Sequence, residues 1–153
     1  MPTLRVELDL DVPCSFVWET LCRNDHWYQW NSFLFDRHPN QTLTLGHSLV
    51  LSLQRIPSES ETKFQAIVTH VEPDTRLQWI AIAPGYRSKH TFELYDLGPH
   101  RTKYIHKETV SGLLSPLFFP FIKKDEQRGI RRMAMELKDY AEAQYSNTQS
   151  YPG

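Results

Sequence analysis

The chain has 153 residues, 40% of them hydrophobic and 23% charged, and its 17 basic and 18 acidic residues give a net charge of −1. This is the composition of one globular domain, and it excludes collagen, coiled coils and wholesale disorder. The balanced charge also argues against nucleic-acid binding, which needs a basic excess on one face. No apolar run approaches the roughly 18–20 residues of a membrane span, and the acidic N-terminal residues do not resemble a signal peptide. We therefore expect a cytoplasmic protein without a membrane span.

The N-terminal residues predict a strand followed by two short helices. From Thr3 to Asp11 apolar and polar residues alternate, which is the pattern of a half-buried strand. Pro13 suits the first turn of a helix, in which Val17 and Leu21, four residues apart, would face the interior. Asn24 to Trp30 predicts a second short helix or turn that is unusually aromatic.

The middle of the chain predicts a meander of antiparallel strands. Apolar residues recur with a period of two, and turn signals containing proline or glycine separate the segments. The expected strands are Phe33 to Arg37, Gly46 to Ile56, Thr62 to Val71, Arg76 to Ala83, Tyr86 to Leu97 and Arg101 to Val110.

The last part of the chain changes to a helical period. Its apolar positions from Ile122 to Ala141 follow about 3.6 residues per turn. This predicts one long amphipathic helix from about Pro120 to Gln144, and a polar tail, 146–153, that we expect to be disordered. Residues 1–145 would then form one domain. The long helix is the only element large enough to cover the concave side of a twisted sheet, and a ligand cavity is expected between them.

Nearly the whole chain, about residues 3 to 143, resembles the START-like helix-grip fold of the SRPBCC superfamily and its polyketide cyclase/dehydrase branch. The matching stretches are VPCSFVWETL, WYQWNSF, HVEPDTRLQW and SKHTFELYDLGPHRTKYIHKETVSGLLSPL. The resemblance implies an α+β fold in which about six or seven antiparallel strands wrap around the long helix and enclose a hydrophobic ligand cavity. Superfamily members include lipid carriers, hormone receptors, cyclases, chaperone activators and oxygenase subunits, so the fold does not give the function.

The last predicted hairpin places polar side chains on a buried face. If its turn is centred on Gly98 and Pro99, residues whose numbers sum to roughly 196 pair, so that His90 would face His106. The face that buries Phe92 also carries other residues by the period of two. These are His90, Tyr104, His106, Glu108 and Val110.

Burial of these groups predicts acid and base chemistry. A desolvated carboxyl has a raised pKa and a desolvated histidine a lowered one, so that such a pair can exchange protons near neutral pH. We expect His106 and Glu108 to form the acid/base pair, with His90 and Tyr104 orienting the substrate or hydrogen-bonding a developing enolate. No metal or organic cofactor is expected. The alternative is a polar ladder that satisfies itself across the strands and has only a structural role.

Further residues are candidates for ligand binding. Glu126 falls at the edge of the buried stripe of the long helix, where it would point into the cavity or pair with Lys123 or Arg128 at the boundary. The aromatic residues near the short helices would stack on a flat ligand or, for Trp30, fill the core. The candidate ligand-binding residues are Trp27, Trp30, Asn31, Trp79, Phe92, Phe118, Ile122, Glu126 and Met133.

Two further segments complete the predictions. Leu113 to Phe121 (LLSPLFFPF) is an apolar stretch that would be a mobile gate or a contact surface for a partner or membrane. Its two prolines favour gating or packing over an amphipathic anchor. If Cys14 and Cys22 lie on one helix they are about 12 Å apart, too far for a disulfide, so we expect reduced thiols.

Together these features predict a cofactor-independent cyclase, dehydratase or isomerase acting on an apolar, polyketide-like small molecule in an internal cavity. The alternative is a non-catalytic carrier or sensor of a lipid or aromatic metabolite, and a third possibility is an interaction domain. We expect a hydrophobic small molecule as partner, no nucleic acid, and a monomer or homodimer.

Overall fold

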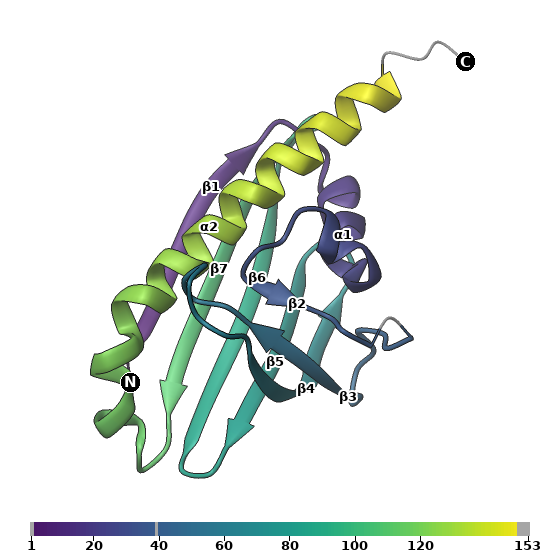
Figure 1. Ribbon diagram of the computed structural model, residues 1–153. Coiled ribbons are helices and arrows are strands. Elements are labelled where there is room, and N and C mark those ends of the chain that lie inside the picture. Colours follow the sequence, from purple (N-terminus) through teal and green to yellow (C-terminus); the bar gives the residue numbers. More distant parts are fainter. Residues whose placement is uncertain (1, 39, 150–153) are drawn as a thin grey trace.

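A computed structural model describes residues 2–38 and 40–149 of the chain. One antiparallel sheet of seven strands, in the order β1-β7-β6-β5-β4-β3-β2, wraps around a long helix (Figure 1). The strands are β1 (Thr3–Leu10), β2 (Leu34–Phe35), β3 (Ser48–Leu53), β4 (Thr62–Glu72), β5 (Arg76–Ala83), β6 (Tyr86–Gly98) and β7 (Arg101–Ser111). The helices are α1 (Cys14–Cys22), the 3₁₀ helix η1 (Asn24–Gln29) and α2 (Ser115–Gln149).

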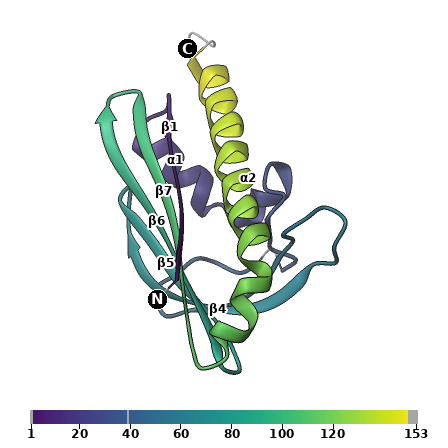
Figure 2. The ribbon, with the colours of Figure 1, turned by 90° about the vertical axis from the view of Figure 1, so that its left-hand side faces the viewer.

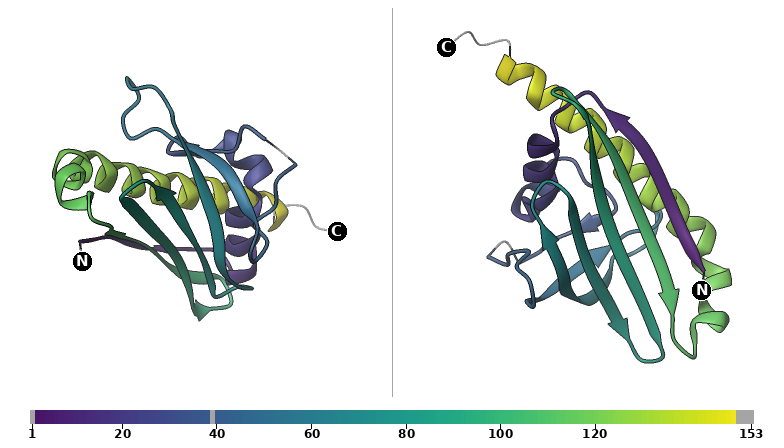
Figure 3. Two further views of the ribbon diagram at one scale, coloured as in Figure 1. Left: turned by 90° about the horizontal axis from the view of Figure 1, so that it is seen from below. Right: turned by 180° about the vertical axis from the view of Figure 1, so that it is seen from behind.

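The arrangement is the predicted α+β helix-grip fold. Figure 2 shows the sheet curving around one side of α2, which packs most closely on β1 and β7. The two short helices follow β1, as expected, and α1 packs near the C-terminal part of α2 through an edge contact between Phe16 and Tyr145, whose ring centroids are 5.4 Å apart. Among the residues that the structure describes, no helix covers the opposite face of the sheet (Figure 3, right).

The core lies between the inner face of the sheet and α2. The alternation within the strands directs large side chains inward, where the most bulky of them are fully buried. These are Trp27, Trp79, Tyr104, Phe33 and Phe92. Helix and sheet approach each other so closely at Gly129 that a Cβ atom there would lie 2.4 Å from the ring of Phe33. Much of the space in which the sequence predicts a cavity is therefore filled.

The long helix differs from its predicted bounds at both ends. It begins at Ser115 instead of Pro120. Pro116 lies in the first turn, where a backbone N–H has no helical acceptor, so the N–H that proline lacks is not missed there. Pro120 removes only one backbone hydrogen bond, at the exposed start of the helix. At the other end α2 continues to Gln149. Residues 146–149 of the predicted tail are thus helical, and 150–153 lie outside the described residues.

The predicted pairing of the last hairpin was wrong by two residues. His90 pairs with Glu108, and Phe92 with His106, so that paired numbers sum to 198. The turn lies one residue later than predicted, at 99–100, and the register shifts again between Asp96 and Gly98. Because a slip of two residues keeps every side chain on its face, the prediction of which residues are buried is confirmed.

Two smaller predictions concern the cysteines and membrane spans. Cys14 and Cys22 are both free thiols, as expected. Among residues 2–38 and 40–149, no helix combines the length and the apolar character needed to cross a membrane.

Candidate acid and base site

A cluster of buried polar side chains lies where β6, β7 and α2 meet. Ser88 and His90 come from β6, His106 and Glu108 from β7, and Glu126 from α2. All five are at most 5% exposed. They are brought together because alternate residues of the two strands point inward toward α2.

Hydrogen bonds connect four of these side chains in a chain. The Ser88 hydroxyl donates to Glu108 Oε2 at 2.8 Å and lies 3.1 Å from His90 Nε2. His90 Nδ1 in turn lies 3.0 Å from His106 Nε2. The single hydroxyl proton of Ser88 goes to Glu108, so His90 Nε2 must donate to Ser88 and, if neutral, accept at Nδ1 from His106. A proton placed on Glu108 Oε2 would allow these bonds to run in the opposite direction, from Glu108 to Ser88 and on to His106.

Two atoms at the ends of this chain have no hydrogen-bond partner among the described residues: His106 Nδ1 and Glu108 Oε1. In the direction assigned above, His106 Nδ1 is a bare acceptor, which is less costly to bury than a bare N–H. Glu108 Oε1 lies 3.7 Å from His90 Nε2. It therefore keeps a lone pair that can accept a proton from outside this series of hydrogen-bonded side chains.

Glu126 faces the same cluster from the helix. Its carboxyl accepts a hydrogen bond from Arg55 Nε at 2.5 Å, and the Arg55 side chain is itself only 19% exposed. One oxygen each of Glu108 and Glu126 and a ring nitrogen of His90 lie within 4.8 Å of one another. Two carboxyl groups and one guanidinium thus share a space from which water is largely excluded.

Burial shifts the proton affinities of both carboxyl groups upward. It raises the pKa of Glu126 to about 8, and the neighbouring charge of Glu108 acts in the same direction, while Arg55 opposes it. Burial also raises the pKa of Glu108, against the hydrogen bonds of Glu126 and Ser88. At neutral pH the pair therefore holds a proton, with Glu126 as its main carrier.

Burial shifts the histidines in the opposite sense. It lowers the pKa of His90 to about 4, against a smaller opposing effect of Glu126. Burial, with a contribution from His90, lowers the pKa of His106 well below its usual value. Both rings are therefore neutral at pH 7, and the 3.7 Å approach of His90 Nε2 to Glu108 Oε1 is not an ion pair.

A pocket of about 170 Å³ opens onto this cluster from between β3, β4, β5 and α2. Its floor is polar, with Ser88, His90, Glu108 and Glu126, and its walls include the apolar residues Leu53, Phe64 and Ala81. Arg55, Lys63 and Tyr86 also line it. The volume is below the roughly 300–1,000 Å³ of drug-sized ligand sites, so it fits a small ligand or one end of a larger one.

Only two of the four predicted catalytic residues line the pocket. His90 and Glu108 line the pocket, whereas His106 and Tyr104 do not. His106 is stacked on Phe92 with ring centroids 4.1 Å apart. Tyr104 is fully buried without a hydrogen-bond partner for its hydroxyl among the described residues, and burial raises its pKa.

Most of the predicted ligand-binding residues belong to the core. Trp79 packs on His90 at 5.8 Å and on Trp27 at 6.1 Å between ring centroids, so both tryptophans lie behind the cluster. Met133 is fully buried and Ile122 half-buried against the core. Of the nine predicted residues only Glu126 lines the pocket. For the others, ligand binding stays a prediction.

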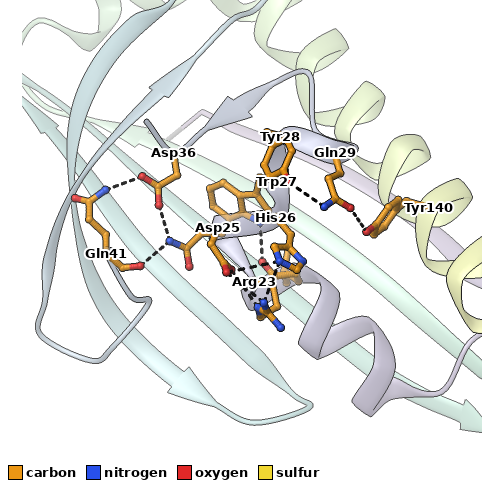
Figure 4. Close-up of polar contacts among 11 residues, drawn as sticks. Arg23, Asp25, His26, Trp27, Tyr28, Gln29, Asp36, Gln41 and Tyr140 are labelled. Atoms are coloured by element: carbon orange, nitrogen blue, oxygen red, sulfur yellow. Dashed lines mark hydrogen bonds and ion pairs between the residues drawn. The ribbon is translucent and has the colours of Figure 1, made fainter. Parts of the chain in front are cut away.

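The aromatic segment around η1 has clear structural contacts. Trp27 Nε1 donates to the Leu21 carbonyl, and Trp30 stacks on Tyr140 with ring centroids 6.2 Å apart. The Asn31 side chain accepts hydrogen bonds from the backbone of residues 33 and 34. Figure 4 shows Gln29 joined to Tyr140 of α2 in the same region. These contacts attach η1 to the rest of the fold.

Sequence reasoning missed two residues of the site, Ser88 and Arg55. Ser88 precedes His90 by two positions and shares its face, so the same period-two argument would have found it. Arg55 follows the end of β3 and reaches Glu126 across 71 positions of sequence, and no local signal predicts that contact.

The chemistry of the cluster bears on metal binding. His90, Glu108 and Glu126 are the one group among residues 2–38 and 40–149 that offers three metal-ligand atoms close together. They come from three different elements, which is why no sequence spacing reveals them. The Arg55 guanidinium already supplies the positive charge beside Glu126. A divalent ion would have to displace it, so the residues fit a metal only in part.

No protein-family model and no curated protein matches the sequence, but solved structures do. A START superfamily protein from Mycobacterium smegmatis has 14% sequence identity and a TM-score of 0.71, over 92% of this chain and 97% of that one. Norcoclaurine synthase from Thalictrum flavum has 13% identity and a TM-score of 0.68, over 92% and 93%. DynU16, from the dynemicin biosynthetic locus, has 20% identity and a TM-score of 0.66; the matched part is 92% of this chain but 47% of DynU16. The chain therefore has the START-like fold that its sequence resemblance implied.

Proposed function

We infer that the protein is an enzyme that moves protons within a bound apolar small molecule, as a cyclase, dehydratase or isomerase without metal or organic cofactor. The observation that carries this proposal is the buried pair Glu108 and Glu126 on the floor of an apolar-walled pocket. A protonated and an ionised carboxyl in one dry site form an acid and a base that both operate near neutral pH.

In this proposal each carboxyl has one role. Glu108, with its unpartnered Oε1, accepts a proton from a carbon next to a carbonyl group. Glu126 donates its proton to the oxygen on which negative charge then develops, and Arg55 stabilises the carboxylate that remains. The substrate has then lost one proton and gained one, so this step needs no external reagent. In an isomerisation Glu108 gives its proton to a different carbon while the enol proton returns to Glu126. In a dehydration Glu108 gives its proton to a β-hydroxyl group, which leaves as water while the enol proton returns to Glu126.

The remaining polar residues act through this pair. Ser88 and His90 hydrogen-bond the base side of the site, and His106 fixes the tautomer of His90 from behind. His106 is thus a positioning residue and not the acid/base partner that the hairpin pattern predicts. The acid in the proposed pair is Glu126, which the sequence predicts only as a ligand-binding residue.

Two comparisons support an enzyme over a carrier. One solved structure with this fold is a norcoclaurine synthase point mutant bound to a transition-state analogue, and another protein of the fold comes from a biosynthetic locus. The polyketide-like character of the substrate rests on the resemblance of the sequence to the polyketide cyclase/dehydrase branch. The pocket volume of about 170 Å³ favours a single ring or the reactive end of a longer compound.

The test is mass spectrometry of small molecules after incubation with a panel of polyketide-derived and lipid compounds, against boiled protein. We expect a new or accelerated product that is lost in Glu108→Gln and Glu126→Gln but kept in Glu93→Gln. Glu93 is a matched control because it is also buried on β6, where Lys107 and Tyr95 pair with it. Compounds retained but recovered unchanged would contradict catalysis and favour a carrier of a lipid or aromatic metabolite.

A further inference from the structure

Five large apolar side chains are exposed just before and within the first turns of α2, and the least exposed of them is Leu114 at 40%. We call the other four the apolar tip; they are Leu113, Leu117, Phe118 and Phe121, with exposures of 96%, 60%, 48% and 83%. Phe119, in the same stretch, is 5% exposed and packs into the core. The predicted gate segment is thus the first turns of a helix, and it directs one phenylalanine inward and two into solvent.

Basic residues continue the same outer face of the helix. Leu117, Phe121, Lys124, Arg128 and Arg131 follow at alternating intervals of four and three residues, which places them in one line along α2. We call Lys123 together with the last three of these the basic stripe, and all four are exposed. Within the part of the chain that the structure describes, none of the four forms an ion pair.

Few acidic groups offset this charge. Asp125 is half-buried beside the stripe, and Glu126 is buried and bound to Arg55. The N-terminal turns of α2 also lie at the edge of the molecule, as the view from below shows (Figure 3, left). The result is a protruding apolar end that is followed directly by unpaired cations.

We propose that the apolar tip and the basic stripe dock the protein on an anionic lipid membrane. Apolar side chains at the end of a helix enter the boundary between headgroups and acyl chains, and adjacent Lys and Arg side chains bind anionic headgroups. A second copy of the chain fits this face poorly, because a two-fold contact would bring like charges together. An acidic protein is the remaining alternative, and an absence of binding to the anionic vesicles below would favour it.

Docking at this end would also place the pocket near the lipid. The backbone N–H of Leu114 donates to the Gly85 carbonyl at 2.8 Å, which attaches the start of α2 to the turn between β5 and β6. Ala83 and Tyr86, on either side of this turn, line the pocket. The docked protein could thus take an apolar ligand directly from the membrane, whether or not it then changes the ligand chemically.

The test is co-sedimentation of the full chain with vesicles of phosphatidylcholine alone or with about 30% phosphatidylserine. We expect binding to the anionic vesicles that falls steeply between about 0.1 M and about 1 M salt. Two double variants should each weaken binding at least tenfold. Leu117→Gln/Phe121→Gln removes two apolar side chains that would enter the lipid. Lys124→Glu/Arg128→Glu reverses two charges, and one basic residue near the surface contributes about fivefold. Leu45→Gln is the matched control, because Leu45 is 61% exposed but lies outside this face, and it should bind like the wild type.

Several results would overturn the proposal. They are an absence of sedimentation with anionic vesicles, equal binding to both vesicle types, and binding that neither double variant weakens. Self-association that needs Phe121, measured by analytical ultracentrifugation, would assign the face to a second copy. Thermal unfolding of each variant checks that it remains folded. We expect it to, because the substituted positions are exposed. Because none of these residues belongs to the proposed acid/base site, the outcome is independent of whether the protein is an enzyme.

Discussion

The inner face of the sheet has a packed end and a hollow end, and the two differ in composition. At the packed end Trp27, Trp79 and Phe92 fill the space between the sheet and the helices with aromatic rings. At the hollow end Glu108 and Glu126 face a pocket of about 170 Å³. The comparison indicates that the first end provides stability, and we propose that the second end is where ligand chemistry takes place.

The largest expected effect concerns the packed end. Trp79→Ala should lower the free energy of unfolding by about 3–5 kcal/mol, because it opens a cavity among rings that cannot close it. Denaturant unfolding measures this loss. Glu126→Gln at the hollow end should cost less than about 1 kcal/mol or stabilise the protein, since it removes a carboxyl that is costly to bury. Equal losses in the two variants would contradict the division into two ends.

The hydrogen bond between Arg55 and Glu126 at the pocket should matter more than an ion pair on the surface. Arg55→Ala removes the partner of Glu126 and should cost about 1–3 kcal/mol, since Glu126 can limit the loss by staying protonated. Arg37→Ala is the control: it breaks the bidentate pair with Glu61, whose two side chains are 52% and 32% exposed, and should cost less than about 1 kcal/mol. Two similar losses would show that the pocket gives Glu126 no special environment.

The pH dependence of stability should show the carboxyl pair directly. Burial raises the pKa of Glu126 from 4.5 to about 8, so between these values the folded protein holds a proton that the unfolded chain releases. Stability therefore falls as the pH rises through this range. His90, with its pKa lowered from 6.5 to about 4, and His106, whose pKa is also lowered, have the opposite effect, which fades as the pH rises above 6.5.

Between pH 6.5 and 8 the carboxyl effect should therefore be the larger of the two. We expect the wild type to lose about 1 kcal/mol of unfolding free energy across this window, and Glu126→Gln to lose much less. Urea unfolding at several pH values measures both slopes. A wild-type slope that Glu126→Gln leaves unchanged would show that another group titrates there.

The smallest expected effect is that of Ser88→Ala. It removes the hydroxyl that joins Glu108 to His90 and should cost about 1 kcal/mol. Ser52→Ala is the control, since Ser52 is also buried but its hydroxyl forms no hydrogen bond among the described residues. If chemical denaturation finds the same cost for both, the chain of hydrogen bonds contributes nothing beyond burial.

Much of this fold was predictable from the sequence because its elements depend on local patterns. The period of two in the strands and the period of 3.6 in α2 follow from the need to bury one face. The start of α2 was not predicted, because proline in a first turn costs little and its sequence does not distinguish a loop from a helix. The hairpin register slipped by two because the turn position and the bulge at Asp96 depend on backbone geometry.

The candidate site was predictable only in part. Alternation identified the buried face of His90, His106 and Glu108, and the helical period placed Glu126 at its edge. Alternation does not tell which stretch of a buried face is packed and which is hollow, since that depends on side chains from distant segments. Arg55 shows this best, because it meets Glu126 only after β3 and α2 have packed together.

The central claim is that the carboxyl pair holds a proton at neutral pH. Carbon-13 NMR of the glutamate carboxyl groups, followed from about pH 3 to about pH 10, tests it most directly. We predict one signal with a midpoint near 8. This signal should be absent in Glu126→Gln and present in the control Glu93→Gln. If every glutamate of the wild type titrates near the ordinary value of about 4.3, the buried acid does not exist and the proposed acid/base site is wrong.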